Sequence, residues 1–167
     1  MKKYGLIALA AILVLSAALS VGGRATAKEP KILEFDSLVG IPPAYTGTQN
    51  PIRGINGGGL PWSIGPSFGE LKANGKLEIT VNDLVFAAGP NTGKNTVASF
   101  RAVVSCLRSD GIVENVMTAP FPATVATATD PGGDAAIEAV LVLPKPCIAP
   151  LVFVTSPGGA WFAATGK

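Results

Sequence analysis

The residue types that carry most enzyme chemistry are scarce in this chain. None of the 167 residues is a histidine. Catalysis of the Ser-His-Asp or Cys-His kind is therefore excluded in its usual form, because no imidazole can act as the base. No Ser-x-x-Lys motif supports a lysine-based variant. A carboxylate pair for glycoside hydrolysis could be assembled from the 11 acidic residues, but their separation cannot be read from sequence. We predict no catalytic residue and a protein that is not an enzyme.

The two cysteines, Cys106 and Cys147, are the candidates for a structural bond. A disulfide between them would close a loop of about 41 residues, worth on the order of 4 kcal/mol in the chain-entropy model. A two-cysteine metal site would need further ligands, and the chain has no histidine to supply them. Asp130 and Asp134, with Glu138, could ligate calcium, although turn chemistry alone explains both aspartates. We predict a disulfide, no metal and no cofactor.

Two tryptophans lie beside loop residues, where they could contact a ligand. Trp62 and Trp161 could each be a stacking platform for a sugar ring or an interface anchor. In the alternative, Trp62 plugs the glycine-rich loop from below, and Trp161 or Phe162 caps the core. Arg53 lies in the same loop as Trp62. The candidate ligand-binding residues are Trp62, Arg53 and Trp161.

These residues require a β-structured frame to position them. The stretch Thr96 to Leu107 alternates as a half-buried strand does. Arg101 lies on its polar face and should not be buried. The face expected to be buried consists of Phe100, Ala102, Val104 and Cys106.

Turn signals recur about every ten residues along the rest of the chain. Asn74-Gly75 predicts a hairpin with a type I′ turn, and a change in apolar phase at Asn82-Asp83 predicts a bulge or sharp bend. A first strand is expected at Ile32 to Leu38, and a hairpin loop at Gly89 to Asn95. About eight short strands without a convincing helix after residue 27 predict an antiparallel β-sandwich, with a small β-barrel as the alternative.

The longest irregular stretch, Gly40 to Pro66, is rich in proline and glycine. Neither a helix nor a long central strand can run through it. A loop of this length in a compact domain usually either acts in function or covers another part of the fold.

The first 27 residues have the composition of a signal peptide. Two lysines precede an uncharged, mostly apolar stretch from Tyr4 to Val21, and Ala25-Thr26-Ala27 supplies the small residues that a signal peptidase reads. We predict a signal-peptide helix over 1–27, cleavage before Lys28, and a single all-β domain over 28–167. An uncleaved membrane anchor is the alternative, since a stretch of about 18 apolar residues is at the lower limit for spanning a bilayer.

The basic excess of the chain belongs to this N-terminal segment. Removing Lys2, Lys3 and Arg24 from the 13 basic residues leaves 10 against 11 acidic ones, so the net charge changes from +2 to about −1. The remaining basic residues are scattered, which gives nucleic-acid binding no support. We predict a secreted or cell-surface protein whose partner is a cell-envelope component or an extracellular protein, with no nucleic acid and no membrane contact after cleavage.

Several short segments of the sequence form a familiar combination: Asn50–Gly54, Ser105–Leu107, Ala119–Pro122, Val152–Thr155 and Gly158–Phe162. Together they resemble small exported bacterial proteins of unknown function. The order of strands and turns, ending in Pro157-Gly158-Gly159 and a final strand, is similar to the all-β CHRD domain of chordin, although the histidines common in that domain are missing here. The resemblance implies an exported all-β domain and supplies no site residue.

Two hypotheses for function follow. In the first, the chain is a non-enzymatic structural or interaction module at the cell surface or in the extracellular matrix. In the second, it is a glycan or small-molecule binding domain that uses the Gly40 to Pro66 loop.

Overall fold

The computed structural model describes residues 28–165, in which β-strands dominate. The described residues form twelve strands rather than about eight, because four very short strands add to eight of five to nine residues. The longer strands are β1 (Lys31–Phe35), β4 (Phe68–Lys72), β5 (Lys76–Val81), β7 (Ser99–Leu107), β8 (Val113–Met117), β10 (Ala135–Val140), β11 (Ile148–Thr155) and β12 (Trp161–Thr165). The short ones are β2 (Leu38–Gly40), β3 (Trp62–Ser63), β6 (Val85–Phe86) and β9 (Phe121–Pro122), and a 3-10 turn, η1, spans Pro43–Tyr45. The predicted signal peptide lies outside the described residues.

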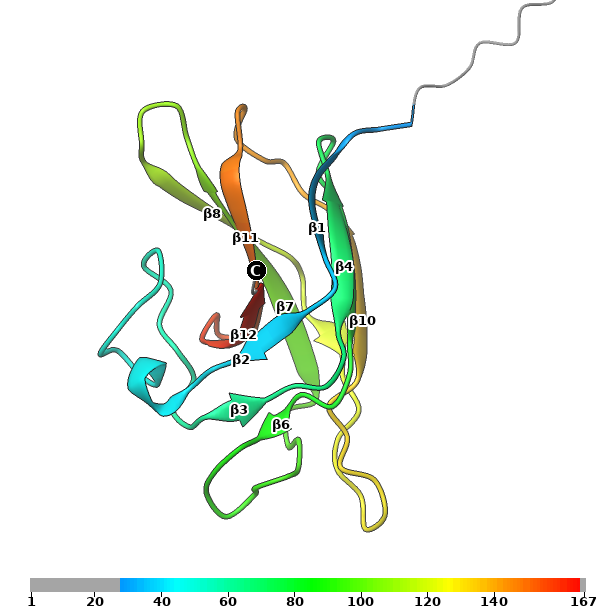
Figure 1. The fold of residues 1–167 in the computed structure, drawn as a ribbon. Coiled ribbons are helices and arrows are strands. Elements are labelled where there is room, and N and C mark those ends of the chain that lie inside the picture. Colours follow the sequence, from blue (N-terminus) through cyan, green and yellow to red (C-terminus); the bar gives the residue numbers. More distant parts are fainter. Residues whose placement is uncertain (1–27, 166–167) are drawn as a thin grey trace, which may run out of the picture.

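Two main sheets pack face to face (Figure 1). The four-stranded sheet has the order β1-β4-β5-β10, and the six-stranded sheet has the order β2-β12-β11-β7-β8, with β9 also paired to β7. All of these strand pairs are antiparallel. β3 and β6 form a separate two-stranded ribbon. No sheet of the described chain closes on itself, so the architecture is an antiparallel β-sandwich and not a small barrel.

The facing surfaces of the two sheets share one core. Leu71, Leu77 and Ile137 are fully buried on the four-stranded side. On the six-stranded side, the predicted inner face of β7 is confirmed: Phe100, Ala102, Val104 and Cys106 are each 0% exposed. Arg101 is only half-buried, as expected.

The first strand differs from the prediction of one run from Ile32 to Leu38. The structure divides it into β1, in the four-stranded sheet, and β2, in the six-stranded sheet. Phe35 and Leu38 are both buried. They are three residues apart, so they cannot point to the same face of one straight strand. A bend at Asp36-Ser37 moves the chain between the sheets and lets both side chains enter the core.

The hairpin between β4 and β5 is confirmed, but its turn is not type I′. Gly75 has a φ of 87°, while Asn74 has no positive φ. The Gly75 N–H donates to the carbonyl of Lys72 at 2.9 Å, and the Lys76 N–H donates to the Asn74 side-chain oxygen. This is the three-residue hairpin loop in which glycine takes the left-handed position of a bulge.

The bend predicted at Asn82-Asp83 is confirmed: β5 ends at Val81, Asp83 has a positive φ of 51°, and the chain continues into β6, which belongs to another sheet. The hairpin expected around Gly89 to Asn95 is wrong. β6 pairs with β3, whereas β7 pairs with β11, β8 and β9. The Gly89 to Asn95 loop therefore connects β6 to a strand of another sheet, with which β6 does not pair.

Candidate functional site

The predicted disulfide is present. Cys106 in β7 is bonded to Cys147, which directly precedes β11, and their Cα atoms are 4.9 Å apart. Because β7 and β11 are adjacent strands, the bond ties neighbours within the six-stranded sheet. No free cysteine is left in residues 28–165. Both cysteines are structural.

Both tryptophans are buried, with only 3% of each residue exposed. Trp62 stacks on Phe162 and also contacts Phe86, with ring centroids 4.1 Å apart in each pair. Trp161 meets Tyr45 and Phe153 edge-on. Neither indole offers a ring face to a ligand in this conformation, and both belong to the packing of the fold.

Residues 41–61, which we call the strap, cover the outer face of the six-stranded sheet (Figure 1). The Gly58 N–H donates to the carbonyl of Trp161 at 2.8 Å, and the Trp161 N–H donates to the carbonyl of Asn56 at 2.9 Å. Val103 and Phe153 point away from the core between the sheets, yet both are buried. Most of the Gly40 to Pro66 loop thus covers a sheet face.

Arg53 fixes the tip of the strap. It forms a two-residue turn with Gly54, both with positive φ (50° and 78°), between Ile52 and Ile55. Its Nη1 donates to the carbonyl of Ser105 at 2.9 Å. Its own carbonyl accepts from the Asn115 side chain at 3.0 Å. The guanidinium is engaged within the fold and holds the strap on β7 and β8.

The calcium hypothesis finds no ligand cluster in the structure. The Asp130 carboxylate accepts from the Gly132 N–H at 2.7 Å, and the Asp134 carboxylate accepts from the Asp83 N–H at 3.0 Å. Glu138 lies apart from both, on the exposed side of β10. Among the residues that the structure describes, no group of three or more His, Cys, Asp or Glu side chains is placed to hold a metal ion.

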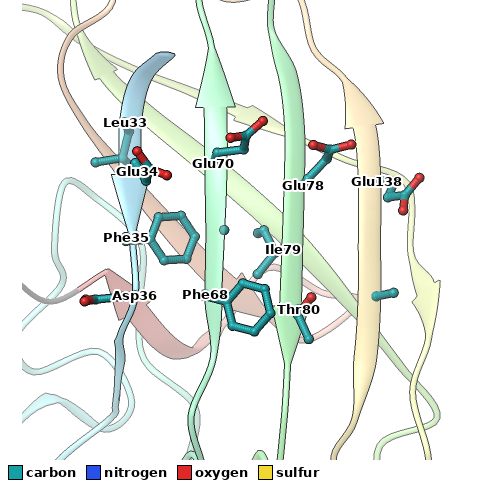
Figure 2. Close-up of a pocket in the computed structure, with 12 residues that line it drawn as sticks. Leu33, Glu34, Phe35, Asp36, Phe68, Glu70, Glu78, Ile79, Thr80 and Glu138 are labelled. Atoms are coloured by element: carbon teal, nitrogen blue, oxygen red, sulfur yellow. The ribbon is translucent and has the colours of Figure 1, made fainter.

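A groove of about 910 Å³ crosses the outer face of the four-stranded sheet (Figure 2). We call it the acidic groove, because five carboxylates line it and no lysine or arginine does. Thr80, Ala136 and the half-exposed ring of Phe68 also line it. Its carboxylates belong to Glu34, Asp36, Glu70, Glu78 and Glu138.

Strand register aligns four of these carboxylates. Glu34 is opposite Glu70, Glu70 is opposite Glu78, and Glu78 is opposite Glu138. In each strand the flanking residues point into the sandwich, so the glutamate points outward. The result is a row of glutamates that runs across all four strands, which Figure 2 shows from the solvent side.

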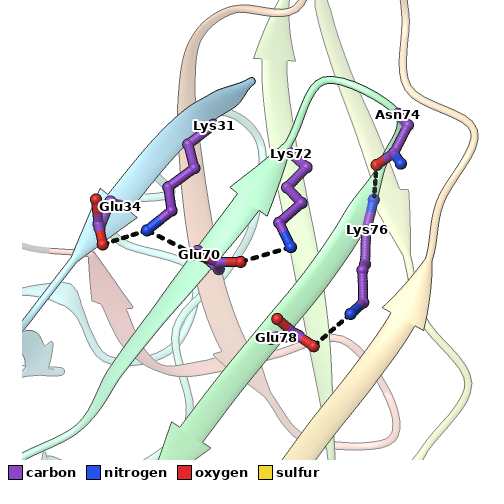
Figure 3. Close-up of polar contacts among 7 residues, drawn as sticks. All are labelled: Lys31, Glu34, Glu70, Lys72, Asn74, Lys76 and Glu78. Carbon is purple, nitrogen blue, oxygen red and sulfur yellow. Dashed lines mark hydrogen bonds and ion pairs between the residues drawn. The ribbon is translucent and has the colours of Figure 1, made fainter. Parts of the chain in front are cut away.

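Three lysines lie beside this row, nearer the turn between β4 and β5 (Figure 3). Lys31 contacts Glu34 at 2.5 Å and Glu70 at 2.8 Å, and Lys72 contacts Glu70 at 2.8 Å. These ion pairs lower the pKa of Glu70 to about 2, first through the hydrogen bond from Lys31 and then through that from Lys72.

A fourth ion pair links two residues on the same face of β5. Lys76 contacts Glu78 at 2.6 Å, and this hydrogen bond raises the pKa of the lysine. The pairs hold the glutamate side chains in place along one side of the groove. Asp36 and Glu138, near its two ends, form no ion pair with any part of the described chain.

The chemistry of the acidic groove is that of an acceptor surface. An ionised carboxylate accepts hydrogen bonds and donates none. A general acid needs a raised pKa, whereas the pKa of Glu70 is lowered. The Glu70 carboxylate is therefore suited to accept hydrogen bonds and not to donate a proton.

The structure does not gather the residues that the sequence proposed as a ligand site. None of Trp62, Arg53 and Trp161 lines the acidic groove. Sequence reasoning missed the glutamate row because its members come from strands far apart in the chain. One signal was available: Glu34, Glu78 and Glu138 each stand between apolar residues in an alternating run.

Comparison of the chain with protein-family models, with curated proteins and with solved structures finds no match. No helix in residues 28–165 is long and apolar enough to cross a membrane.

Proposed function

We propose that this chain is an exported, non-enzymatic interaction module that binds its partner in the acidic groove. The observation that carries the proposal is the groove itself, which spans four strands of a disulfide-tied sandwich and contains five carboxylates and a half-exposed phenylalanine. A large half-exposed aromatic ring in a concave, charged surface is typical of binding sites. The rigid sheet beneath it presents the side chains in fixed positions.

Two observations support a location for this module and a class of partner. The disulfide indicates an oxidising compartment, which agrees with the signal peptide expected at residues 1–27. The carboxylates of the groove would repel a phosphate backbone, which argues against a nucleic-acid partner. We therefore place the module at the cell surface or in the extracellular matrix, with an envelope component or an extracellular protein as its partner.

The second hypothesis, a glycan or small-molecule site in the Gly40 to Pro66 loop, has less support. The strap is fixed by Arg53, and both Trp62 and Trp161 are in the core. The family resemblance remains a prediction and adds no binding residue to either hypothesis.

The test is binding of residues 28–167, with the disulfide intact, to washed envelopes and to the extracellular matrix of the cells that make the protein. Phe68→Ala should weaken binding by roughly three- to tenfold, because the aromatic contact is lost. Val39→Ala is the matched control, since Val39 is a similarly exposed apolar residue on β2. Equal binding by the two variants would show that the groove is not the interaction site.

A further inference from the structure

The acidic groove also indicates the chemistry of its partner. We propose that it holds an extended basic segment of another protein, with two arginine or lysine side chains about four residues apart. This inference rests on the proposed function and names the partner of the same site.

The lining determines which groups a ligand must bring. The polar side chains in the groove are five carboxylates and the hydroxyl of Thr80. Carboxylates need donors, and arginine and lysine carry five and three N–H donors respectively, together with the opposite charge. A neutral glycan can also donate its hydroxyls to carboxylates, but it brings no opposite charge, and it stacks best on a flat exposed aromatic ring. The groove offers Phe68 and no tryptophan or tyrosine.

The existing ion pairs between lysines and glutamates determine where a cationic ligand can bind in the groove. The lysines occupy the side nearest the turn between β4 and β5, so they would repel a cation there (Figure 3). Asp36 and Glu138 have no ion pair in the described chain and are exposed. Glu138 acts on Lys76 only through its charge. The two unpaired carboxylates are therefore the strongest attractors for cationic side chains.

The geometry of the sheet sets the spacing of those side chains. Asp36 follows β1 and Glu138 lies on β10, so three inter-strand steps separate them. Each step is about 4.8 Å, and Asp36 is offset from the glutamate row by two residues along its strand. The carboxylates of Asp36 and Glu138 are therefore roughly 15 Å apart. An extended peptide covers that length in about four to five residues, and positions i and i+4 lie on the same side of it.

Phe68 lies between these ends, on β4 (Figure 2). Phe68 is 54% exposed and lies two residues from Glu70 on the same face of β4. A guanidinium can stack on the ring while its N–H groups reach a neighbouring carboxylate. The centre of the groove therefore favours arginine, or an apolar side chain of the partner.

The probe for this proposal is a labelled ten-residue peptide of glycine, serine and threonine with two arginines four positions apart. Fluorescence anisotropy with residues 28–167 at low ionic strength measures its affinity. An isomer with adjacent arginines should bind roughly three- to tenfold more weakly, because only one guanidinium can then reach an unpaired carboxylate. Added salt should weaken binding of the first peptide, since the contacts are between exposed charges.

The paired variant Asp36→Asn with Glu138→Gln should bind the first peptide about tenfold more weakly. Glu29→Gln with Glu114→Gln is the matched control, because it removes the same charge outside the groove and should change affinity less than twofold. All four positions are on the surface or partly exposed, and unchanged urea midpoints would show that each variant folds. Equal weakening by the two pairs would overturn the proposal, since bulk charge would then explain the binding.

Other occupants have their own outcomes. If an amino-sugar oligomer binds more tightly than the peptide, the proposal is wrong and the partner is a glycan. If the protein forms a concentration-dependent dimer that Asp36→Asn with Glu138→Gln abolishes, the proposal is wrong and the partner is a second copy of the chain. If no peptide binds but Phe68→Ala still weakens binding to the envelopes or the matrix, the groove is the interaction site and only the proposed partner chemistry is wrong. If Phe68→Ala has no effect either, the proposed function falls as well.

Discussion

A single glycine at the β4–β5 turn holds the hairpin against the chain that follows β10. Gly75 has a φ of 87°, and a Cβ built on it would lie 1.8 Å from the carbonyl oxygen of Leu141. The same two residues form a backbone hydrogen bond, from the Leu141 N–H to the Gly75 carbonyl at 2.9 Å. The contact is between backbones, so no side chain can move to relieve the clash.

Gly75→Ala should therefore destabilise the protein by more than its backbone conformation alone explains. Gly111→Ala is the control, because Gly111 has a φ of 79° with no atom within 4 Å of a built Cβ. The free energy of unfolding should fall by about 1–2 kcal/mol in the control. In Gly75→Ala it should fall by roughly 1–3 kcal/mol more. Urea unfolding measures both. Equal losses would show that the chain at Leu141 yields without cost.

Residue-level expectations succeeded where one strand face meets the core. The four alternating residues of β7 are buried as predicted, from Phe100 to Cys106. Val103 and Ser105, on the other face, are buried as well. Alternation cannot predict this second burial, because the cover comes from the strap, some fifty residues earlier in the chain. The type I′ turn predicted at Asn74-Gly75 is wrong, because only Gly75 has a positive φ there. At Arg53-Gly54 both residues have a positive φ.

At the scale of elements, one side chain, that of Arg53, anchors the tip of the strap. Arg53→Ala removes the guanidinium that donates to Ser105 and should cost roughly 1–3 kcal/mol. The strap should also loosen over Trp161, which would raise quenching of tryptophan fluorescence by acrylamide. Arg108→Ala is the control, since Arg108 forms only exposed ion pairs at a hairpin tip. Identical quenching in the two variants would mean that apolar packing alone holds the strap.

The glutamate row shows why a site on a sheet is harder to predict than the sheet. Alternation places Glu78 and Glu138 on the outer faces of their strands. It does not say that β5 and β10 are neighbours, nor that these two residues are opposite each other. Between them the chain passes through three strands of the other sheet, and the pairing depends on how both sheets bury their inner faces together. The sandwich was therefore predictable, while the groove on it was not.

At the scale of the whole molecule, the ion pairs of the outer face make stability depend on pH at both extremes. The folded pKa of Glu70 is about 2, below its ordinary value of 4.5. Its contribution to stability is therefore complete above about pH 4.5 and is lost as the pH falls toward 2. The pKa of Lys31 is raised above 10.5, first through its hydrogen bond with Glu34. Its contribution is complete below pH 10.5 and is lost as the pH rises through the raised value.

Glu70→Gln isolates the acid limb of this dependence. The variant cannot ionise at this position, so its urea midpoint should fall less steeply than that of the wild type between about pH 4.5 and 2. The two curves should run parallel between pH 5 and 9, where Glu70 stays ionised in both the folded and the unfolded wild type. Glu29→Gln should follow the wild-type curve throughout, because Glu29 is exposed outside the row. If Glu70→Gln and the wild type keep a constant difference down to pH 2, Lys31 and Lys72 do not hold the Glu70 carboxylate in solution.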